Sequence, residues 1–391
     1  MDFLELIETY SAREASLDRL YAREGRSLHR RGNPAFEGRV LRTMQFLHAA
    51  ATGEIPHHRL HEAMTTSDFP LLFGTVLQRQ VLGNYRAWPS TWRTIAKIRT
   101  VPDFRLVETG YPMLGGDGIL EEVKELAPYP AEALEEQAPF TYKVKKYGRR
   151  MPFTWEAWIN DVTGQLKDVP KRFGVAAIRS EQHYFTSLYV SAAGPRSTVY
   201  TSGNRNQVII ANGAVANNPP LSIAGLQDGF TVLANQLDPA TNEPIMLDGV
   251  VLEIPPNLEI TAQNILNATQ IIIGADSANE RILTGNWMKD KVKLVLNPSL
   301  RQINTTNGAT AWYLHATGEV RPFIEAAFLQ GHETPEMFMK SPDAVRISGG
   351  GLVDPTAGSF DNDSLDFKIR HIFGGIVVDA LASVASEGDG T

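Results

Sequence analysis

The segment from residue 103 to residue 155 most constrains the fold, because it is long and charged and lacks a hydrophobic core of its own. Its first half is broken by Gly115-Gly116-Asp117-Gly118 and by Pro128, Pro130 and Pro139, which excludes a long helix. Residues 140–145 alternate with a period of two, which is typical of a strand. We therefore expect a long two-stranded ribbon. Because an isolated ribbon is only marginally stable in water, it must lie against something else.

Charge divides this ribbon into two parts. Acidic residues occupy the first part (Glu108, Asp117, Glu121, Glu122, Glu125, Glu132, Glu135 and Glu136), and basic residues occupy the second (Lys143, Lys145, Lys146, Arg149 and Arg150). One interpretation is a solvated hairpin. However, ordering a ribbon without a core costs conformational entropy, which docking onto a neighbouring subunit would offset. Charge complementarity would then set the register of the docked ribbon.

The composition is that of a folded protein without thiol chemistry. The chain has 391 residues, of which 43% are hydrophobic and 21% charged, and this length predicts two or more substructures. Its 37 Lys and Arg against 44 Asp and Glu give a net charge of −7. The absence of cysteine excludes disulfide scaffolds, thiolate zinc sites, iron–sulfur clusters and cysteine nucleophiles. Stability must come from packing, from association of copies, or from both.

Nothing in the sequence predicts a membrane span or a secretion signal. The longest apolar runs, such as 271–273 and 374–378, are far shorter than the roughly 18 to 20 residues that a bilayer requires. Asp2, Glu5 and Glu8 interrupt the N-terminus where a signal peptide would be apolar. We expect a soluble protein of the cytoplasm that has no membrane partner.

Hydrophobic periodicity predicts a mixed α+β chain. Helices are expected from about residue 66 to Tyr85, from Pro170 to Ala193, from Ser222, as the N-cap, to Asp238, and on a shorter face from Leu258 to Leu266. Strands are expected at 250–254, 271–273, 292–296, 312–314 and 365–378, the last with a turn or bulge at Gly374-Gly375. Residues 195–220 are typical of a surface loop or a short hairpin around Val208-Ile209-Ile210.

Residues 1–65 predict helices joined at Gly32-Asn33-Pro34, and their basic residues are all arginine or histidine. Four arginines recur along one side of the first of these helices: Arg19, Arg23, Arg26 and Arg30. Guanidinium groups match phosphate geometry, so one hypothesis is contact with nucleic acid. The other is a solvated helix face, and the sequence supports both equally.

Motifs for catalysis and metal binding are missing. The sequence has no phosphate-binding loop, no dinucleotide-binding glycine pattern, no G-x-S-x-G elbow and no H-E-x-x-H helix. The best metal candidates are His57, His58, His61 and Glu62, which we interpret as solvent-facing. Asp361, Asp363 and Asp366 lack the glycine and the distal glutamate of a calcium loop, so we expect a hydrated turn. We predict no metal, no cofactor and no catalytic residue.

Three stretches in this order carry a resemblance to a known family: 65–74 (TTSDFPLLFG), 251–259 (VLEIPPNLE) and 367–375 (FKIRHIFGG). With them, the chain from about Thr65 to Ser386 resembles a major capsid protein of a tailed bacteriophage with the Hong Kong 97-type fold. The resemblance implies an N-arm at 66–102 and an extension loop at 103–155. It further implies a peripheral domain with a spine helix at 156–240, an axial domain at 241–362 and a return strand at 363–391, after a helical segment at 1–65.

The resemblance implies a shell protein without enzymatic activity. Copies would form hexamers and pentamers of an icosahedral virion capsid around double-stranded DNA, assembled in the cytoplasm of a bacterial host. Portal, scaffold or decoration proteins are possible partners. We expect inter-subunit salt bridges in the extension loop from Glu121, Glu122, Glu125, Lys143, Lys145 and Arg149. For the four arginines, DNA contact inside the shell is one of the two open interpretations, and a solvated helix face is the other. Residues 1–65 are expected to stay attached, and lysine–asparagine crosslinks are not predicted.

Two other hypotheses stay open. An encapsulin-like bacterial compartment would share the fold but enclose enzyme cargo in place of DNA. A hydrolase that uses His57 and His61 is disfavoured by the missing nucleophile motif.

Overall fold

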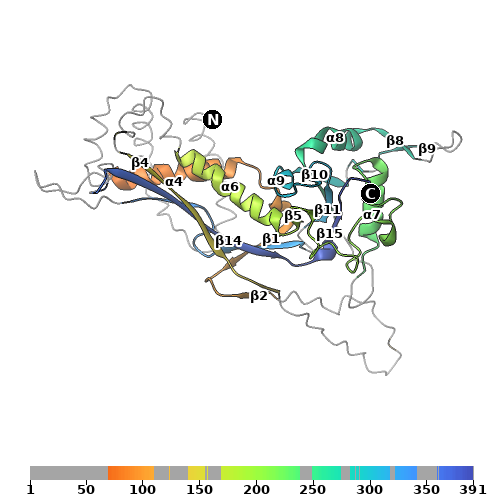
Figure 1. Cartoon of the computed structure of the whole chain (residues 1–391), viewed down its shortest axis with the longest axis horizontal. Helices are drawn as coiled ribbons and strands as arrows, with labels where there is room; N and C mark the ends of the chain where they lie inside the picture. Colours follow the sequence, from red (N-terminus) through yellow and green to blue (C-terminus); the bar gives the residue numbers. More distant parts are fainter. Residues whose placement is uncertain are drawn as a thin grey trace, which may run out of the picture. The chain divides into compact units, whose positions relative to one another are not determined.

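The computed structural model of the chain is a mixed α+β protein (Figure 1). It describes residues 69–109, 123, 140–154, 156, 169–237, 249–273, 282–286, 288–289, 291–317, 322–340, 359 and 361–390. Two compact units are distinguished. Unit 1 takes in the described residues of Met1–Pro89, Lys146–Arg179 and His332–Ile372, and unit 2 those of Ser90–Lys145, Ser180–Gly331 and Phe373–Thr391.

Unit 1 consists of helix segments packed on a three-stranded sheet. Its elements are α4 (Phe69–Ala87), β4 (Lys145–Thr154), the first part of α6 (Val169–Ser187), β13 (Glu336–Met339) and the first part of β14 (Ser364–Val377). Strand β14 lies between β4 and β13. It runs antiparallel to β13, with Glu336 opposite Arg370 and Met339 opposite Phe367.

The core of unit 1 lies between these helices and one face of the sheet. Along β14, Leu365, Phe367 and Ile369 are buried and Lys368 is exposed, as the period of a strand requires. The helices contribute Val81 and Tyr85 of α4, and Val169, Phe173, Ala177 and Ile178 of α6. A Cβ at Gly174 would lie 2.6 Å from the carbonyl oxygen of Val81, so glycine permits the close approach of α6 to α4 seen in Figure 1.

Unit 2 contains two larger sheets and three strand pairs. One sheet has the order β10 (Val292–Leu296), β7 (Val250–Ile254), β11 (Trp312–Ala316), β15 (Ser383–Ser386), with β10 and β7 parallel and the other pairs antiparallel. In the other, β12 (Ile324–Leu329) lies between the parallel strand β1 (Ala96–Val101) and antiparallel residues 373–377 of β14. The antiparallel pairs join β2 (Val107–Thr109) to β3 (Phe140–Tyr142), β5 (Val190–Ser191) to β6 (Gly194–Pro195), and β8 (Gln270–Ile273) to β9 (Ile282–Gly285).

Helices complete unit 2. They are the second part of α6, α7 (Ile223–Ala234), α8 (Glu259–Asn267), α9 (Ser299–Ile303) and the 3-10 turns η2 (Trp92–Thr94), η3 (Ile210–Asn212), η4 (Pro256–Leu258) and η5 (Ala380–Ala382). Leu252 of β7 and Leu314 of β11 belong to a core shared with α7 and α8. The alternate residues of the same strands, Glu253 and His315, are buried on the opposite face.

Most expected elements are observed. The strands at 250–254 and 292–296 have the predicted limits, β8, β11 and β14 cover the other three, and α8 carries the predicted face at Ala262, Ile265 and Leu266. The Ser222 side chain caps α7 by accepting a hydrogen bond from the Gly225 amide. The pairing of β2 with β3 confirms two strands at the base of the ribbon.

Two predicted helix ends were wrong. Helix α6 ends at Ser187 and not near Ala193, because Tyr189 and Val190 are buried by tertiary packing and β5 pairs Val190 with Pro195. Helix α7 ends at Ala234, where the Asn235 amide bonds back to Thr231 and the Gln236 side chain turns to the Arg205 carbonyl. Strands β1, β4, β5, β6, β9, β12, β13 and β15 were not predicted as separate elements. Residues 208–212 form a loop with η3, which is the loop of the two predicted alternatives.

Candidate functional site

The predicted basic residues of the ribbon lie on the surface. Lys143 is exposed between β3 and β4, and Lys145 and Arg149 are exposed on β4. Several predicted residues fall outside the described part of the chain, namely Glu121, Glu122, Glu125, Arg19, Arg23, Arg26, Arg30, His57, His58, His61 and Glu62. The predicted salt bridges between the acidic and basic parts of the ribbon therefore stay a prediction.

The base of the ribbon is fixed in the core of unit 2. Tyr142 is buried and its hydroxyl donates a hydrogen bond to the carboxylate of Glu325 on β12. Val144 is also buried. A Cβ at Gly374 would lie 2.6 Å from the carbonyl oxygen of Lys143, so the backbones of β14 and the ribbon meet directly. These contacts set the position from which the ribbon leaves the body.

Glu325 is a buried carboxylate whose charge is compensated at this base. Its exposed fraction is 2%, and Nη1 of Arg99 on β1 lies 3.4 Å from its Oε1. A buried carboxylate is stabilised by hydrogen-bond donors and by a nearby cation. Through its contacts with Arg99 and Tyr142, Glu325 joins β1, β12 and the ribbon.

In unit 1, Arg150 of β4 binds Asp366 of β14 with both guanidinium arms. Nε lies 2.9 Å from Oδ1 and Nη2 lies 2.5 Å from Oδ2. The side-chain hydrogen bond to Asp366, together with its charge, raises the pKa of Arg150. Asp366 thus pairs with a guanidinium across two strands, whereas Asp361 and Asp363 are exposed in the preceding turn.

A second charged cluster of unit 1 is centred on Glu336 of β13. Nη2 of Arg370 lies 2.6 Å from its Oε2, and Nδ1 of His332 lies 2.5 Å from its Oε1. Partial burial disfavours the ionised carboxylate, but the hydrogen bonds from Arg370 and His332 outweigh it and lower the pKa of Glu336. Arg370 and Lys368 also lie over the ring of Phe338.

Unit 2 contains a fully buried polar network around Glu253. Tyr189 donates to Oε2 at 2.7 Å, Asn297 donates to Oε1 at 2.7 Å, and Nε2 of His315 lies 3.0 Å from Oε2. Nδ1 of His315 lies 2.9 Å from the Ser383 hydroxyl, which lies 2.7 Å from the hydroxyl of Tyr200. All hydrogen-bonding atoms of the Glu253 and His315 side chains therefore have partners.

The line Ser383–His315–Glu253 has the residue types of a hydrolase triad, but its surroundings do not suit catalysis. The exposed fractions of the three side chains are 0%, 0% and 1%, so no substrate reaches the serine. Burial, followed by the charge of Glu253, raises the pKa of Tyr189, and burial raises that of Tyr200. Both tyrosine hydroxyls stay protonated, Tyr189 donates to Glu253, and the network holds these buried side chains together.

Sequence reasoning missed this network although one signal was present. Residues 250–254 read as a buried strand, and the glutamate at its fourth position should have raised the question of a partner. The partners His315, Asn297 and Ser383 come from three other segments, and no local pattern connects them.

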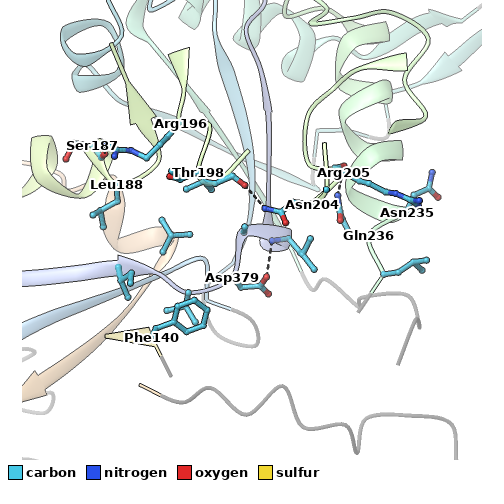
Figure 2. A pocket seen from close by; sticks show the side chains of 18 residues that line it. Phe140, Ser187, Leu188, Arg196, Thr198, Asn204, Arg205, Asn235, Gln236 and Asp379 are labelled. Carbon is cyan, nitrogen blue, oxygen red and sulfur yellow. Dashed lines mark hydrogen bonds between the residues drawn. The ribbon is translucent and has the colours of Figure 1, made fainter. Parts of the chain in front are cut away.

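A cleft of about 790 Å³ lies in unit 2 beside the end of α6 and the turn η5 (Figure 2). Three of its polar side chains are engaged in the chain's own hydrogen bonds. Arg196 donates to the Ser187 carbonyl, Gln236 to the Arg205 carbonyl, and Asp379 accepts from the Leu381 amide. The described lining holds no paired acid and base, so the cleft does not have the constitution of a catalytic site.

Metal and membrane sites were also sought in the part of the chain that the structure describes. It holds no cluster of three or more His, Asp or Glu side chains that could ligate a metal ion. None of its helices combines the length and the apolar character needed to cross a bilayer.

Comparison with solved structures finds phage capsids and encapsulins. A structure titled Gordonia phage Cozz is 14% identical, with coverage of 76% of this chain and 85% of that chain and a TM-score of 0.43. The cyanophage Pam1 capsid is 11% identical, with coverage of 79% and 93% and a TM-score of 0.43. The encapsulin of Synechococcus elongatus is 9% identical, with coverage of 78% and 89% and a TM-score of 0.42.

The family of the chain is shown by comparison of its sequence. No curated protein matches the chain significantly. The family model described as phage capsid protein matches residues 137–386, which is more than half of the chain. This match runs from the base of the ribbon to the end of β15, and it confirms the expected α+β capsid fold and the expected shell function. The chain belongs to the phage capsid protein family and is a structural subunit of a virion shell.

Proposed function

We propose that this subunit builds an icosahedral head of hexamers and pentamers around double-stranded DNA and performs no catalysis. The observation that carries the proposal is the ribbon, whose base is held in the core of unit 2 by Tyr142, Val144 and Gly374. A fixed base with opposite charges on its two parts suits repeated, heterologous contact with the next copy, and such contacts close into rings.

The proposal includes a role for each segment. Residues 66–102 are the N-arm, 103–155 the extension loop, 156–240 the peripheral domain with α6 as spine helix, 241–362 the axial domain and 363–391 the return strand. The order of elements supports this assignment. Helix α4 lies in the N-arm before the ribbon, α6 follows the ribbon as the spine helix, and the long strand β14 forms the return strand near the end of the order. Salt bridges from Glu121, Glu122 and Glu125 to Lys143, Lys145 and Arg149 of another copy would fix the loop.

Further partners belong to the same proposal. The arginines at 19, 23, 26 and 30 face the DNA through non-specific phosphate contacts, and portal, scaffold or decoration proteins complete a particle assembled in the bacterial host cytoplasm. Residues 1–65 stay on the subunit. Mass spectrometry of shell protein should therefore give the intact 43.1 kDa chain, and a chain that begins near Thr65 would refute retention.

Deleting residues 110–135 tests the proposal. The variant should remain a folded, soluble subunit, because the paired strands β2 and β3 and their anchor at Glu325 are kept. It should form no shells in electron micrographs, whereas the full chain should form closed shells. The exposed Glu156→Ala variant is the control and should assemble normally. Normal shells from the deletion, or no shells from the full chain, would count against the proposal. Particles that contain protein cargo and no DNA would favour the alternative of an encapsulin-like compartment.

A further inference from the structure

The side chain of Gln78 on α4 bonds to the backbone of β13 in unit 1. Among the described strands, β13 pairs with β14 alone and stands at the end of the strand order. Nε2 of Gln78 donates to the Pro335 carbonyl at 2.8 Å, and its Oε1 accepts from the Met337 amide at 2.9 Å. A carboxamide that donates and accepts in this way takes the place of a peptide group in a neighbouring strand.

The register of the sheet shows that these two groups belong to the outer edge of β13. The Lys340 amide, just after the strand, donates to the Asp366 carbonyl of β14. In an antiparallel ladder the residues that bond to one neighbour alternate along the strand, so the even-numbered residues of β13 bond to β14. The odd-numbered residues Pro335, Met337 and Met339 therefore turn their backbone groups to the outer edge, where Gln78 meets them.

The two edge strands of this sheet differ in their own protection against pairing with another chain. Basic residues and a proline, which commonly protect edge strands, occur in β4: Lys146, Arg149, Arg150 and Pro152. Strand β13 has the sequence Glu-Met-Phe-Met, without lysine, arginine or proline. Its one charge, on Glu336, is bonded to Arg370, and its Phe338 is 37% exposed. The edge of β13 therefore requires protection by another part of the chain.

Without Gln78, the edge of β13 would be complementary to itself. Two copies related by a twofold axis at Met337 would form an antiparallel pair in which each Met337 stands opposite the other and each Glu336 stands opposite a Phe338. This register places no like charges opposite each other. Its main-chain hydrogen bonds would use the Met337 amide and the Pro335 carbonyl, which are the two groups that Gln78 occupies.

We propose that Gln78 prevents two copies of this chain from pairing through their β13 edges. The contact of α4 with β13 is then an inhibitory one, and the partner that it excludes is the β13 strand of a second copy. Free backbone groups at a sheet edge template the addition of a strand, and the Gln78 side chain removes two of them from use. The inference goes beyond the proposed shell, since it concerns the subunit before assembly.

Replacement of Gln78 by leucine tests this role. Gln78→Leu removes both hydrogen bonds to β13 and keeps a good helix former, and Gln80→Leu on the same helix is the matched control. Analytical ultracentrifugation of the unassembled subunit should show that Gln78→Leu dimerises about tenfold more tightly than the wild type and the control. Gln78→Ala is the second variant and should dimerise in the same way. Circular dichroism checks that each variant is folded.

Proline at position 337 tests whether such a dimer uses the β13 edge. In the Gln78→Leu background, Met337→Pro removes an amide that points outward and keeps the hydrogen bonds to β14, so the dimer should dissociate. Met337→Leu, which keeps the amide, should leave the dimer intact. Folded Gln78→Leu and Gln78→Ala that stay as monomeric as the wild type would overturn the inference, and so would a dimer that Met337→Pro does not dissociate. Because these measurements need no shell, a wild-type chain that never assembles would count against the proposed function alone.

Discussion

The buried side chain of Glu253 fixes the positions of several other side chains in the core of unit 2. Its carboxylate is buried among Tyr189, Asn297 and His315, which all have it as a hydrogen-bond partner. Removing one partner of a buried polar network leaves the others unsatisfied and costs more than the net value of the bonds.

Truncation of Glu253 should therefore be severe. We expect Glu253→Ala to lower the free energy of unfolding by about 3 kcal/mol, measured by urea unfolding of the unassembled subunit. Glu253→Gln should lose less, since it keeps one oxygen acceptor. The exposed Glu156→Ala should stay within about 0.5 kcal/mol of the wild type. Equal stabilities for the two alanine variants would contradict a structural role of the network.

Glu336 should make stability depend on pH in the acid range. Its pKa is lower in the folded state than in the unfolded state, since Arg370 and His332 favour the ionised form. This contribution is therefore complete above the ordinary carboxyl value of about 4.3 and is lost as the pH falls through the lowered folded value.

Thermal unfolding of the wild type and of Glu336→Gln at several pH values would measure this effect. The wild type should be the more stable protein at pH 7, and the difference should shrink as the pH falls below about 4. A difference that grows on acidification would mean that the glutamate is held in its neutral form.

At the scale of elements, the approach of α6 to α4 depends on Gly174. Alanine usually stabilises the interior of a helix relative to glycine, by about 1 kcal/mol. Here the added Cβ would lie 2.6 Å from the Val81 carbonyl oxygen and 3.1 Å from the Tyr85 amide nitrogen, and these backbone atoms cannot rotate away. Gly174→Ala should therefore lower the melting temperature. Gly285→Ala, whose Cβ meets nothing within 4 Å, is the control. A higher melting temperature for Gly174→Ala would show that the two helices can move apart without a loss of stability.

The sequence predicted those elements whose own residues carry the pattern. Strand β7 is a continuous apolar run around one glutamate, and Ser222 is a polar cap before an apolar helix face, so both were found. Strand β1 was missed because Lys97 and Arg99 interrupt it, and its pairing with β12 lies more than two hundred residues away. The end of α6 was misplaced because Tyr189 is held by a distant glutamate.

The same distinction applies to the candidate site. Lys143, Lys145 and Arg149 are exposed, as is usual for charged side chains, and their predicted salt bridges to another copy stay a prediction. The anchor of the ribbon on Glu325 could not be foreseen, because it joins residues 142 and 325 through a shared core. Local sequence patterns thus predict which side chains are exposed to solvent. Only the tertiary structure shows which residues hold the base of the ribbon.

For the whole molecule, the net charge of −7 averages over an arginine-rich beginning. If that beginning faces packaged DNA, replacing Arg19, Arg23, Arg26 and Arg30 by alanine should leave shells intact and reduce the DNA retained at increasing salt. Conversion of all four to lysine keeps the charge and should restore most of the retention. The amount of DNA per particle, measured by ultraviolet absorbance, distinguishes the two interpretations. If the arginines lie on a solvated helix face, neither variant should change the amount of DNA.

The register of β11 gives the buried network one more consequence. Tyr313 stands opposite Glu253 and His315 opposite Ser383, so a shift of β11 by one residue would turn His315 toward the hydrophobic core and leave a buried carboxylate without its imidazole. A misregistered subunit would lose the hydrogen bonds between Glu253, His315 and Ser383, so the network favours a single register of β11 in every copy of the subunit.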